Sequence, residues 1–158
     1  MAEAAGAVIL AGGHAECLRI DGQYLPKVLQ PIGAKPLLEL QLEWLRGAGF
    51  DSVVLCLGYN AQAIRALVED GSRFGVRLRY SVEESPRGTA GAVKALGPAS
   101  LPEDILVLYG DTLPMVDIKK MLQFHRAHSA LATLALHECA GHLTGKSGHG
   151  PECEPVVL

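Results

Sequence analysis

The stretch AVILAGG, from Ala7 to Gly13, joins a short apolar run to a pair of glycines, and ILVLYGD, from Ile105 to Asp111, repeats this design with an aspartate. Apolar runs that stop abruptly at glycine are typical of strands covered on both faces. These two stretches therefore predict two buried strands, each followed by a loop whose residues are candidates for ligand binding or catalysis.

Strand and helix patterns alternate around these two stretches. Further strands are predicted at 52–57, 76–82 and 131–136, and helices at 37–46, 61–70, 88–96 and 116–128. This alternation predicts an α/β fold with a Rossmann-like, doubly wound, mostly parallel sheet. The segment 76–82 has one wetter face and is expected near a sheet edge. A strand order of 3-2-1-4 would bring the glycine loop and Asp111 to one crevice, where such sheets bind ligands.

Composition excludes several classes of protein. The chain has 158 residues, of which 49% are hydrophobic, and a net charge of −3. This length fits one domain, and the apolar content excludes a disordered chain. No apolar run is long enough for a membrane span, no secretory signal is expected, and the charge argues against bulk nucleic-acid binding. Four cysteines without a framework spacing favour a reducing, cytoplasmic location.

Three features are candidates for binding phosphate or a metal ion. The glycine pair Gly12-Gly13 lets backbone N–H groups approach an anion, although such a pair is also a common turn. Lys27 follows a proline, which would aim its ammonium at a phosphate, and the alternative is a solvated surface lysine. Asp111 ends a buried strand and suits Mg²⁺ shared with substrate phosphates. The alternative for Asp111 is a helix cap or a turn aspartate.

Taken together and in order, these pieces resemble the sugar-1-phosphate nucleotidylyltransferases, also called NDP-sugar pyrophosphorylases. The matching stretches are Leu10–Gly13, Pro26–Ile32, Lys35–Glu39, Gly58–Asn60, Gly71–Val76, Tyr80–Ala92 and Tyr109–Thr112. The resemblance covers residues 6–136. It implies transfer of NMP from an NTP to a sugar 1-phosphate, with release of pyrophosphate, and Mg²⁺ as cofactor.

The resemblance also implies roles for individual residues. Lys27 pairs the phosphates and Asp111 holds the metal, so both are implied to be catalytic. Glu83 takes the position that reads the base edge; its carboxylate only accepts hydrogen bonds, which mildly favours GTP over uracil or thymine nucleotides. The residues implied to line the base and ribose, or to lie beside the base, are Leu10, Ala11, Gly12, Gly13, Gly88 and Thr89.

The signature loop departs from the family pattern. The family has Gly-Gly-x-Gly-Thr-Arg-Leu where this chain reads GGHAECL from Gly12 to Leu18. Ala15 replaces a glycine, Glu16 adds a negative charge, and Cys17 replaces the arginine that neutralises the pyrophosphate. Losing one such positioned charge costs on the order of 100- to 1000-fold in rate.

The resemblance fades after residue 136. We therefore predict a nucleotide-binding domain at 1–136 and a divergent, flexible tail at 137–158. The pairs Cys139-x-x-His142 and His149-x-x-x-Cys153 have the spacing of zinc ligands, but we favour a tail without a metal. The family's later part supplies the sugar-binding residues and a second carboxylate. Asp117 is a candidate replacement for that carboxylate, although we favour a helix N-terminal role.

Two main hypotheses for function follow. The first is an enzyme that uses an NTP and a sugar 1-phosphate, and Lys27, Gly88 and Asp111 favour it. The second is a non-catalytic homologue that binds a nucleotide or sugar nucleotide and regulates a full-length partner, and Cys17 favours it. A third is an incomplete product without activity. A homo-oligomer is compatible with each of them, and the sequence does not identify the sugar.

Overall fold

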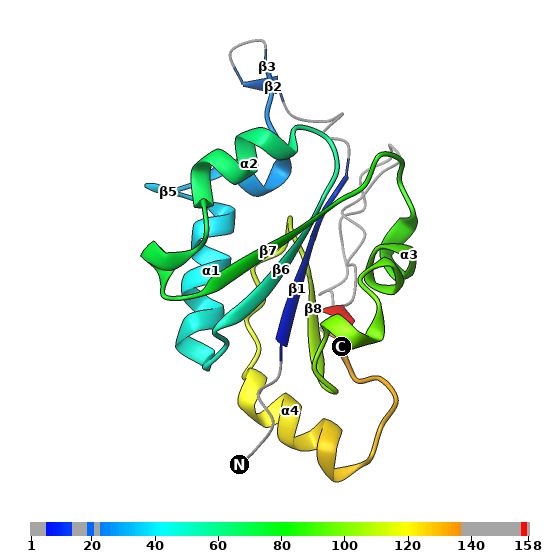
Figure 1. The fold of residues 1–158 in the computed structure, drawn as a ribbon. Coiled ribbons are helices and arrows are strands. Elements are labelled where there is room, and N and C mark those ends of the chain that lie inside the picture. Colours follow the sequence, from blue (N-terminus) through cyan, green and yellow to red (C-terminus); the bar gives the residue numbers. More distant parts are fainter. Residues whose placement is uncertain (1–5, 14–18, 21–22, 137–155, 158) are drawn as a thin grey trace, which may run out of the picture.

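A four-stranded parallel sheet forms the centre of the protein in the computed structural model, which describes residues 6–13, 19–20, 23–136 and 156–157 (Figure 1). Its strands are β1 (Gly6–Ala11), β6 (Ser52–Leu57), β7 (Arg77–Val82) and β8 (Ile105–Tyr109). They lie in the order β7-β6-β1-β8, and each neighbouring pair is parallel. This confirms the predicted 3-2-1-4 order and the edge position of β7.

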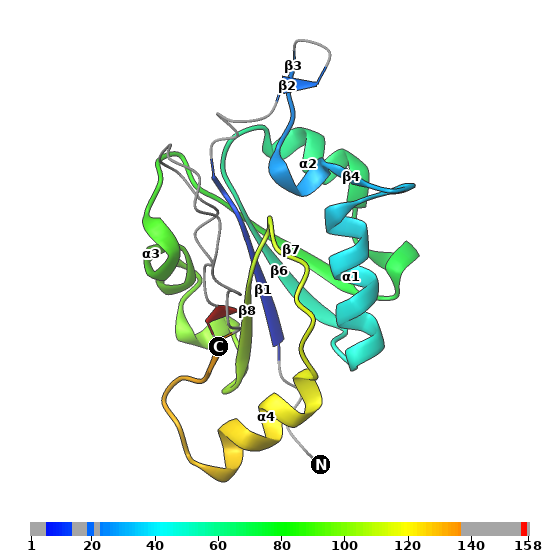
Figure 2. The same ribbon diagram turned by 180° about the vertical axis from the view of Figure 1, so that it is seen from behind.

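Helices cover both faces of this sheet (Figures 1 and 2). The helices α1 (Leu37–Ala48) and α2 (Ala61–Val68) pack on one face, and α3 (Gly88–Ala95) packs on the other. The fourth helix, α4 (Ile118–Ala127), contributes Ile118 to the core on the α1 side. The three-layer arrangement expected from the alternating pattern is therefore present.

The side-chain pattern of β1 explains why its sequence is almost continuously apolar. Ala7 and Ile9 belong to the core under α1 and α2, whereas Val8 belongs to the core under α3. Successive residues of a strand point to opposite faces, so a strand covered on both faces needs apolar residues throughout. In the observed register, Ala7 lies opposite Val53 of β6 and Leu106 of β8.

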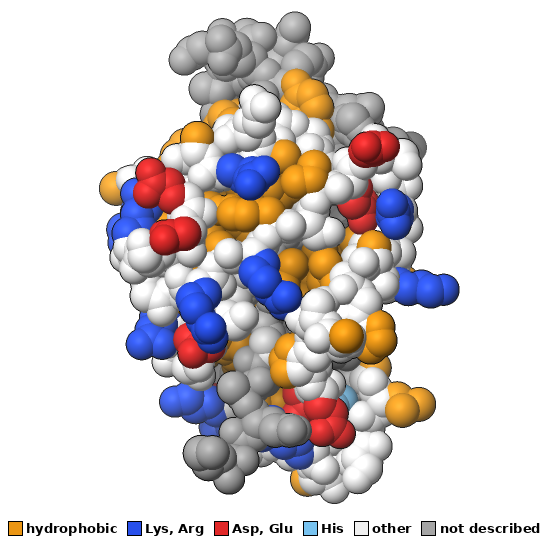
Figure 3. Space-filling view, viewed as in Figure 1, with side chains coloured by type: hydrophobic (Ala, Val, Ile, Leu, Met, Phe, Trp, Pro, Cys, Tyr) orange, Lys and Arg blue, Asp and Glu red, His pale blue; other side chains and the backbone are white. Residues whose placement is uncertain are grey.

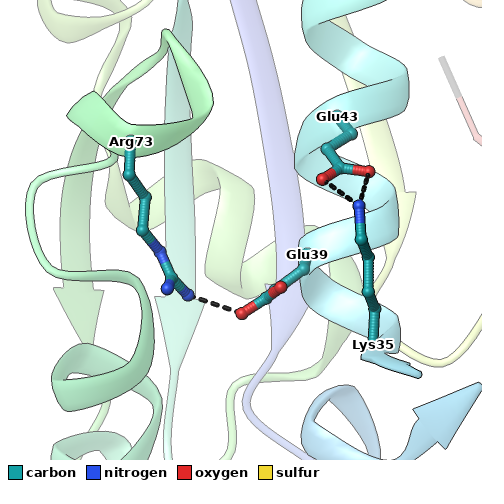
Figure 4. A network of polar contacts seen from close by, with 4 residues as sticks. All are labelled: Lys35, Glu39, Glu43 and Arg73. Atoms are coloured by element: carbon teal, nitrogen blue, oxygen red, sulfur yellow. Dashed lines mark hydrogen bonds and ion pairs between the residues drawn. The ribbon is translucent and has the colours of Figure 1, made fainter.

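The buried side chains of α1 follow the periodicity of a helix and form the face that packs against the core. Its buried residues recur at helical spacing, and all are apolar except Gln41. The helix ends at Gly49, whose φ of 101° lies in the left-handed region that favours glycine. Outside the core, Lys35 pairs with Glu43 and Arg73 pairs with Glu39 (Figure 4). These partly exposed pairs contribute little to stability, about 0–1 kcal/mol each.

Some segments differ from the sequence-based predictions. The strand predicted at 131–136 is limited to β9 (Leu134–Ala135), which pairs antiparallel with β10 (Val156–Val157) outside the main sheet. The helix predicted at 61–70 ends at Val68, because Glu69 has a φ of 48° and leaves the helical conformation. Asn60 occupies the N-cap position as expected, but its side chain makes no capping hydrogen bond.

The predicted loops contain short ordered elements. Two hairpins are present, β2 (Arg19–Ile20) with β3 (Gln23–Tyr24) and β4 (Pro31–Ile32) with β5 (Lys35–Pro36). Single 3-10 turns form η1 (Lys27–Leu29), η2 (Ser72–Phe74) and η3 (Pro98–Ser100). Acidic side chains lie among basic ones on the face drawn in Figure 3. Among the helices that the structure describes, none is long and apolar enough to cross a membrane.

Candidate active site

A pocket of about 360 Å³ lies at the carboxyl ends of the central strands. This is the place where ligands bind in open α/β sheets. All nine residues singled out in the sequence line it: Leu10, Ala11, Gly12, Gly13, Lys27, Glu83, Gly88, Thr89 and Asp111. The structure thus brings together every predicted site residue, while their binding roles stay predictions.

Close contact between the strand ends forms the floor of the pocket. The amide of Gly110 donates to the carbonyl of Leu10 at 2.8 Å. A Cβ on Gly110 would lie 2.5 Å from Cγ1 of Val28 and 2.8 Å from that same carbonyl oxygen. A Cβ on Gly58 would lie 2.6 Å from the carbonyl oxygen of Gly12. Only glycine fits at these two positions, and the chain following β1 can therefore meet the chains following β6 and β8.

Lys27 and Asp111 are in direct contact at the wall of the pocket. Lys27 opens the η1 turn, in which the amide of Gln30 donates to the Lys27 carbonyl at 3.1 Å. Its Nζ lies 2.8 Å from Oδ2 of Asp111, and both side chains are partly exposed. The carboxylate also accepts a long hydrogen bond, 3.4 Å, from the Thr112 hydroxyl. Lys27 is therefore a member of an ion pair at the pocket wall.

Asp111 suits a metal ion shared with a substrate better than a metal held by protein alone. Among the residues that the structure describes, no group of three or more His, Cys, Asp or Glu side chains could hold a metal. Mg²⁺ commonly takes one or two carboxylates and completes its shell with water and substrate phosphates. A single exposed carboxylate beside a pocket of about 360 Å³ fits that chemistry.

Asp117 serves as a helix cap. Its Oδ1 accepts a hydrogen bond from the backbone amide of Lys120 at 3.1 Å, at the start of α4. This hydrogen bond lowers the pKa of the Asp117 carboxyl. The helix N-terminal role favoured from the sequence is confirmed, and the cap of α4 is Asp117 rather than Asp111.

The opposite wall of the pocket combines a helix N-terminus with a carboxylate. Gly88, with a φ of 70°, begins α3, and Thr89 follows it. Glu83 continues β7, since its amide donates to the Leu57 carbonyl at 2.8 Å. Its Oε2 accepts a hydrogen bond from the Arg87 amide at 3.4 Å, whereas its Oε1 is buried without a partner among the described residues. A buried acceptor of this kind needs a donor, which a ligand can supply.

Cys56 lies in the pocket wall as a neutral thiol. Burial, and to a lesser extent the nearby negative charge of Glu83, raise the pKa of this thiol to about 11. A thiol that stays protonated at neutral pH is a poor nucleophile. Cys56 therefore provides an apolar surface in the pocket.

Sequence reasoning assigned no role to several other residues at the pocket. The additional lining residues are Val28, Cys56, Pro86, Arg87, Ala92, Tyr109 and Gly110. Arg87 and Tyr109 belong to the stretches that carry the family resemblance, and Tyr109 approaches Thr89 with its hydroxyl at 3.5 Å from Oγ1. The available signal was that Arg87 directly precedes α3 and that Tyr109 is the last residue of β8. Ala15, Glu16, Cys17 and the proposed zinc ligands at 139, 142, 149 and 153 lie outside the described residues.

Comparison with known protein families identifies the family of this chain. The family described as Nucleotidyl transferase matches residues 6–141. The chain belongs to the nucleotidyl transferase family. The chain is 38% identical over 131 residues to a D-glycero-alpha-D-manno-heptose 1-phosphate guanylyltransferase of Aneurinibacillus thermoaerophilus. It is 37% identical over 131 residues to a mannose-1-phosphate guanyltransferase of Pichia angusta.

Solved structures agree with this membership. The chain superposes with a TM-score of 0.69 and 29% identity on HddC from Yersinia pseudotuberculosis, crystallised with GMP-PN. A putative glucose-1-phosphate thymidylyltransferase from Bacillus anthracis gives a TM-score of 0.74 at 22% identity, which shows the shared fold. The alignments cover 82% and 83% of this chain, and 56% and 54% of those chains.

The coverage of the curated relatives is also partial. The alignments cover 82% of this chain and 56% of the Aneurinibacillus protein, and 80% of this chain and 36% of the Pichia protein. The chain therefore spans about half, or less, of the length of these relatives.

Proposed function

We propose that this protein transfers a nucleoside monophosphate from an NTP to a sugar 1-phosphate and releases pyrophosphate. One observation carries the proposal: a single pocket joins the Gly12-Gly13 loop, the Lys27 ammonium, the Asp111 carboxylate and the N-terminus of α3. Backbone amides and an ammonium suit phosphates, and a helix N-terminus favours negative charge.

The proposed reaction is a displacement at phosphorus. A phosphate oxygen of the sugar 1-phosphate attacks the α-phosphorus of the NTP and forms a new P–O bond. The bond from the α-phosphorus to the oxygen shared with the β-phosphorus breaks, and pyrophosphate leaves with the electron pair. Lys27 would stabilise the negative charge on the phosphate oxygens, and Asp111 would hold Mg²⁺, which supplies further charge neutralisation.

Glu83 supports guanine as the base. A carboxylate accepts hydrogen bonds only, and guanine offers two N–H donors on its Watson–Crick edge. Glu83 lines the pocket, and its buried Oε1 has no hydrogen-bond partner among the described residues. Two of the relatives named above are guanylyl- or guanyltransferases, although a UTP–glucose-1-phosphate uridylyltransferase of Synechocystis is 33% identical over 139 residues, covering 81% of this chain and 36% of that protein. We therefore propose GTP as the mildly preferred nucleotide.

We also propose the cytoplasm as the location, because the four cysteines lack the spacing of a disulfide framework.

A second candidate function is nucleotide or sugar-nucleotide binding without turnover, in a regulatory homologue. Cys17 favours it, because a cysteine stands where the family has the arginine that neutralises pyrophosphate. In this case the pocket would bind its ligand while the chemistry would be slow or absent.

A pyrophosphate-release assay separates the two candidates. The chain is incubated with GTP, Mg²⁺ and mannose, heptose or glucose 1-phosphate, and pyrophosphate is coupled to phosphate detection. Turnover that depends on the sugar phosphate and disappears in Lys27→Ala supports the enzyme. GTP binding without pyrophosphate release in any combination supports the regulatory homologue and contradicts the enzyme.

A further inference from the structure

Gln41 is the one polar or charged residue in the buried set of the described residues. It lies in α1, and its side chain has no solvent exposure. Its amide Nε2 donates two hydrogen bonds, to the carbonyl oxygen of Tyr109 at 2.9 Å and to that of Thr112 at 2.6 Å. These two carbonyls flank Gly110 and Asp111. The side chain therefore clamps both ends of the turn that carries the carboxylate.

The same helix is also bonded to the segment that carries Lys27. The amide of Leu37, the first residue of α1, donates to the carbonyl of Gln30 at 2.9 Å. Gln30 in turn closes the η1 turn by donating to Lys27 at 3.1 Å. One helix thus supports both members of the ion pair in the pocket.

We propose that Gln41 is a positioning residue that fixes the Asp111 turn for metal and phosphate binding. This inference rests on the proposed function, because that function assigns Asp111 the role of a metal ligand. Gln41 lines no part of the pocket and acts only through the backbone of residues 109–112. Outer groups that orient a metal ligand are commonly worth about 10- to 100-fold in metal affinity.

The other contacts of this turn explain why the clamp is needed. Gly110 is held by its hydrogen bond to Leu10 at 2.8 Å, which secures the side of the turn nearest β8. On the far side, the amide of Thr112 makes only a long bond of 3.3 Å to Tyr109, whereas the Thr112 carbonyl receives the short bond from Gln41. Gln41 therefore supplies the firm attachment beyond Asp111.

Gln41 differs from an ordinary core residue because its buried side chain is polar. Its Oε1 is buried without a partner among the described residues, which is unfavourable in an apolar core. Leucine or methionine would fill the same space without an unpaired oxygen. The two donated hydrogen bonds are what an apolar side chain cannot provide, and both act on the Asp111 turn.

Hydrogen exchange in the ligand-free chain tests the positioning directly. Gln41→Met keeps the length of the side chain and removes both donors. Leu45→Ala, at a fully buried position one turn further along α1, is the control for general loss of stability. We expect amides 110–112 to exchange about 10-fold faster or more in Gln41→Met, beyond the change seen in Leu45→Ala. Equal exchange in the two variants would overturn the proposal.

A titration with Mg²⁺ or Mn²⁺ tests the consequence for binding. At fixed GTP, the metal concentration for half-maximal binding should rise about 10- to 100-fold in Gln41→Met, while affinity without metal changes little. Leu45→Ala should lower the melting temperature and leave the metal requirement unchanged. If Gln41→Met kept the metal requirement of the wild type, the proposal would be wrong. If the wild type bound no nucleotide, the proposed function would fail, and exchange at 110–112 would still decide whether Gln41 positions the turn.

Discussion

Nζ of Lys27 lies 2.8 Å from Oδ2 of Asp111, although the two residues are 84 positions apart in the sequence. The parallel order of the strands places their loops side by side, and Gly110 permits the close approach. In the absence of ligand the two charges neutralise each other. In the proposed function, a nucleotide with its metal would offer each of them a new partner of opposite charge, phosphate for Lys27 and Mg²⁺ for Asp111.

Removal of the Lys27 ammonium should weaken nucleotide binding. In Lys27→Met we expect the Kd for GTP with Mg²⁺ to rise about 10- to 100-fold, because a charged hydrogen bond to phosphate is lost. Lys35→Met is the matched control, since Lys35 also pairs with a carboxylate, that of Glu43, but lies outside the pocket (Figure 4). Calorimetric titration measures both. Equal affinities of the two variants would refute a phosphate-binding role for Lys27.

Neutralising Asp111 should remove the metal dependence of binding. We expect GTP to bind Asp111→Asn with the same affinity with and without Mg²⁺, because the amide is a poor ligand for this cation. Asp117→Asn is the control, since asparagine also caps helices and Asp117 lies at the start of α4. A wild-type response to Mg²⁺ in Asp111→Asn would show that the metal is held elsewhere.

The carboxylate of Glu83 should determine the preference for guanine. Glu83→Gln replaces one acceptor oxygen with an NH₂ donor that opposes the N–H groups of guanine, so we expect GTP affinity to fall about 10-fold or more. Glu84→Gln, at the exposed neighbouring position, should bind GTP like the wild type. Competition between GTP, UTP, ATP and dTTP measures the effect. An unchanged order of preference in Glu83→Gln would mean that another residue reads the base.

Glycine is required at position 110 but not at 47. A Cβ on Gly110 would overlap Val28 and the Leu10 carbonyl, so Gly110→Ala should lower the free energy of unfolding by about 1–3 kcal/mol. A Cβ on Gly47, within α1, meets no atom within 4 Å, and Gly47→Ala should raise it by about 0.4–1 kcal/mol. Chemical denaturation compares the two. If Gly110→Ala were as stable as the wild type, the close approach of the strand ends would be wrong.

The buried thiol of Cys56 predicts a pH dependence of stability. Its pKa is raised from 9.0 to about 11 in the folded state, so the folded chain binds its proton more tightly than the unfolded chain. This contribution is complete below pH 9 and is lost as the pH rises through about 11, with an upper limit of about 2–3 kcal/mol. Denaturation at several alkaline pH values should show a smaller loss in Cys56→Ala. Parallel curves for the two chains would contradict this assignment.

The positions of two strands of the main sheet followed from the sequence because strands buried on both faces leave unambiguous apolar runs. Ser52–Leu57 and Ile105–Tyr109 have the bounds predicted for them. The segment 131–136 was apolar too, but only Leu134–Ala135 forms a strand, and both Leu131 and Leu136 are exposed. Apolar residues alone do not distinguish a strand of the central sheet from a short peripheral pair.

The site was less predictable than the fold because Gln41 contacts it only through the backbone carbonyls of Tyr109 and Thr112. Glycines and charged residues at strand ends indicated the pocket, since few other roles suit them in those places. Gln41 was missed because a single glutamine within an amphipathic helix resembles a boundary residue. Its position in the apolar stripe of α1, with Leu38, Leu42 and Leu45, was the signal that could have identified it.

The most direct test of the account is calorimetric titration of the purified chain with GTP, with and without Mg²⁺. We predict saturable binding that is strengthened by Mg²⁺ and exceeds that of UTP, ATP and dTTP. A folded chain that binds none of the four nucleotides, with or without Mg²⁺, would contradict the proposal that this pocket is a nucleotide site.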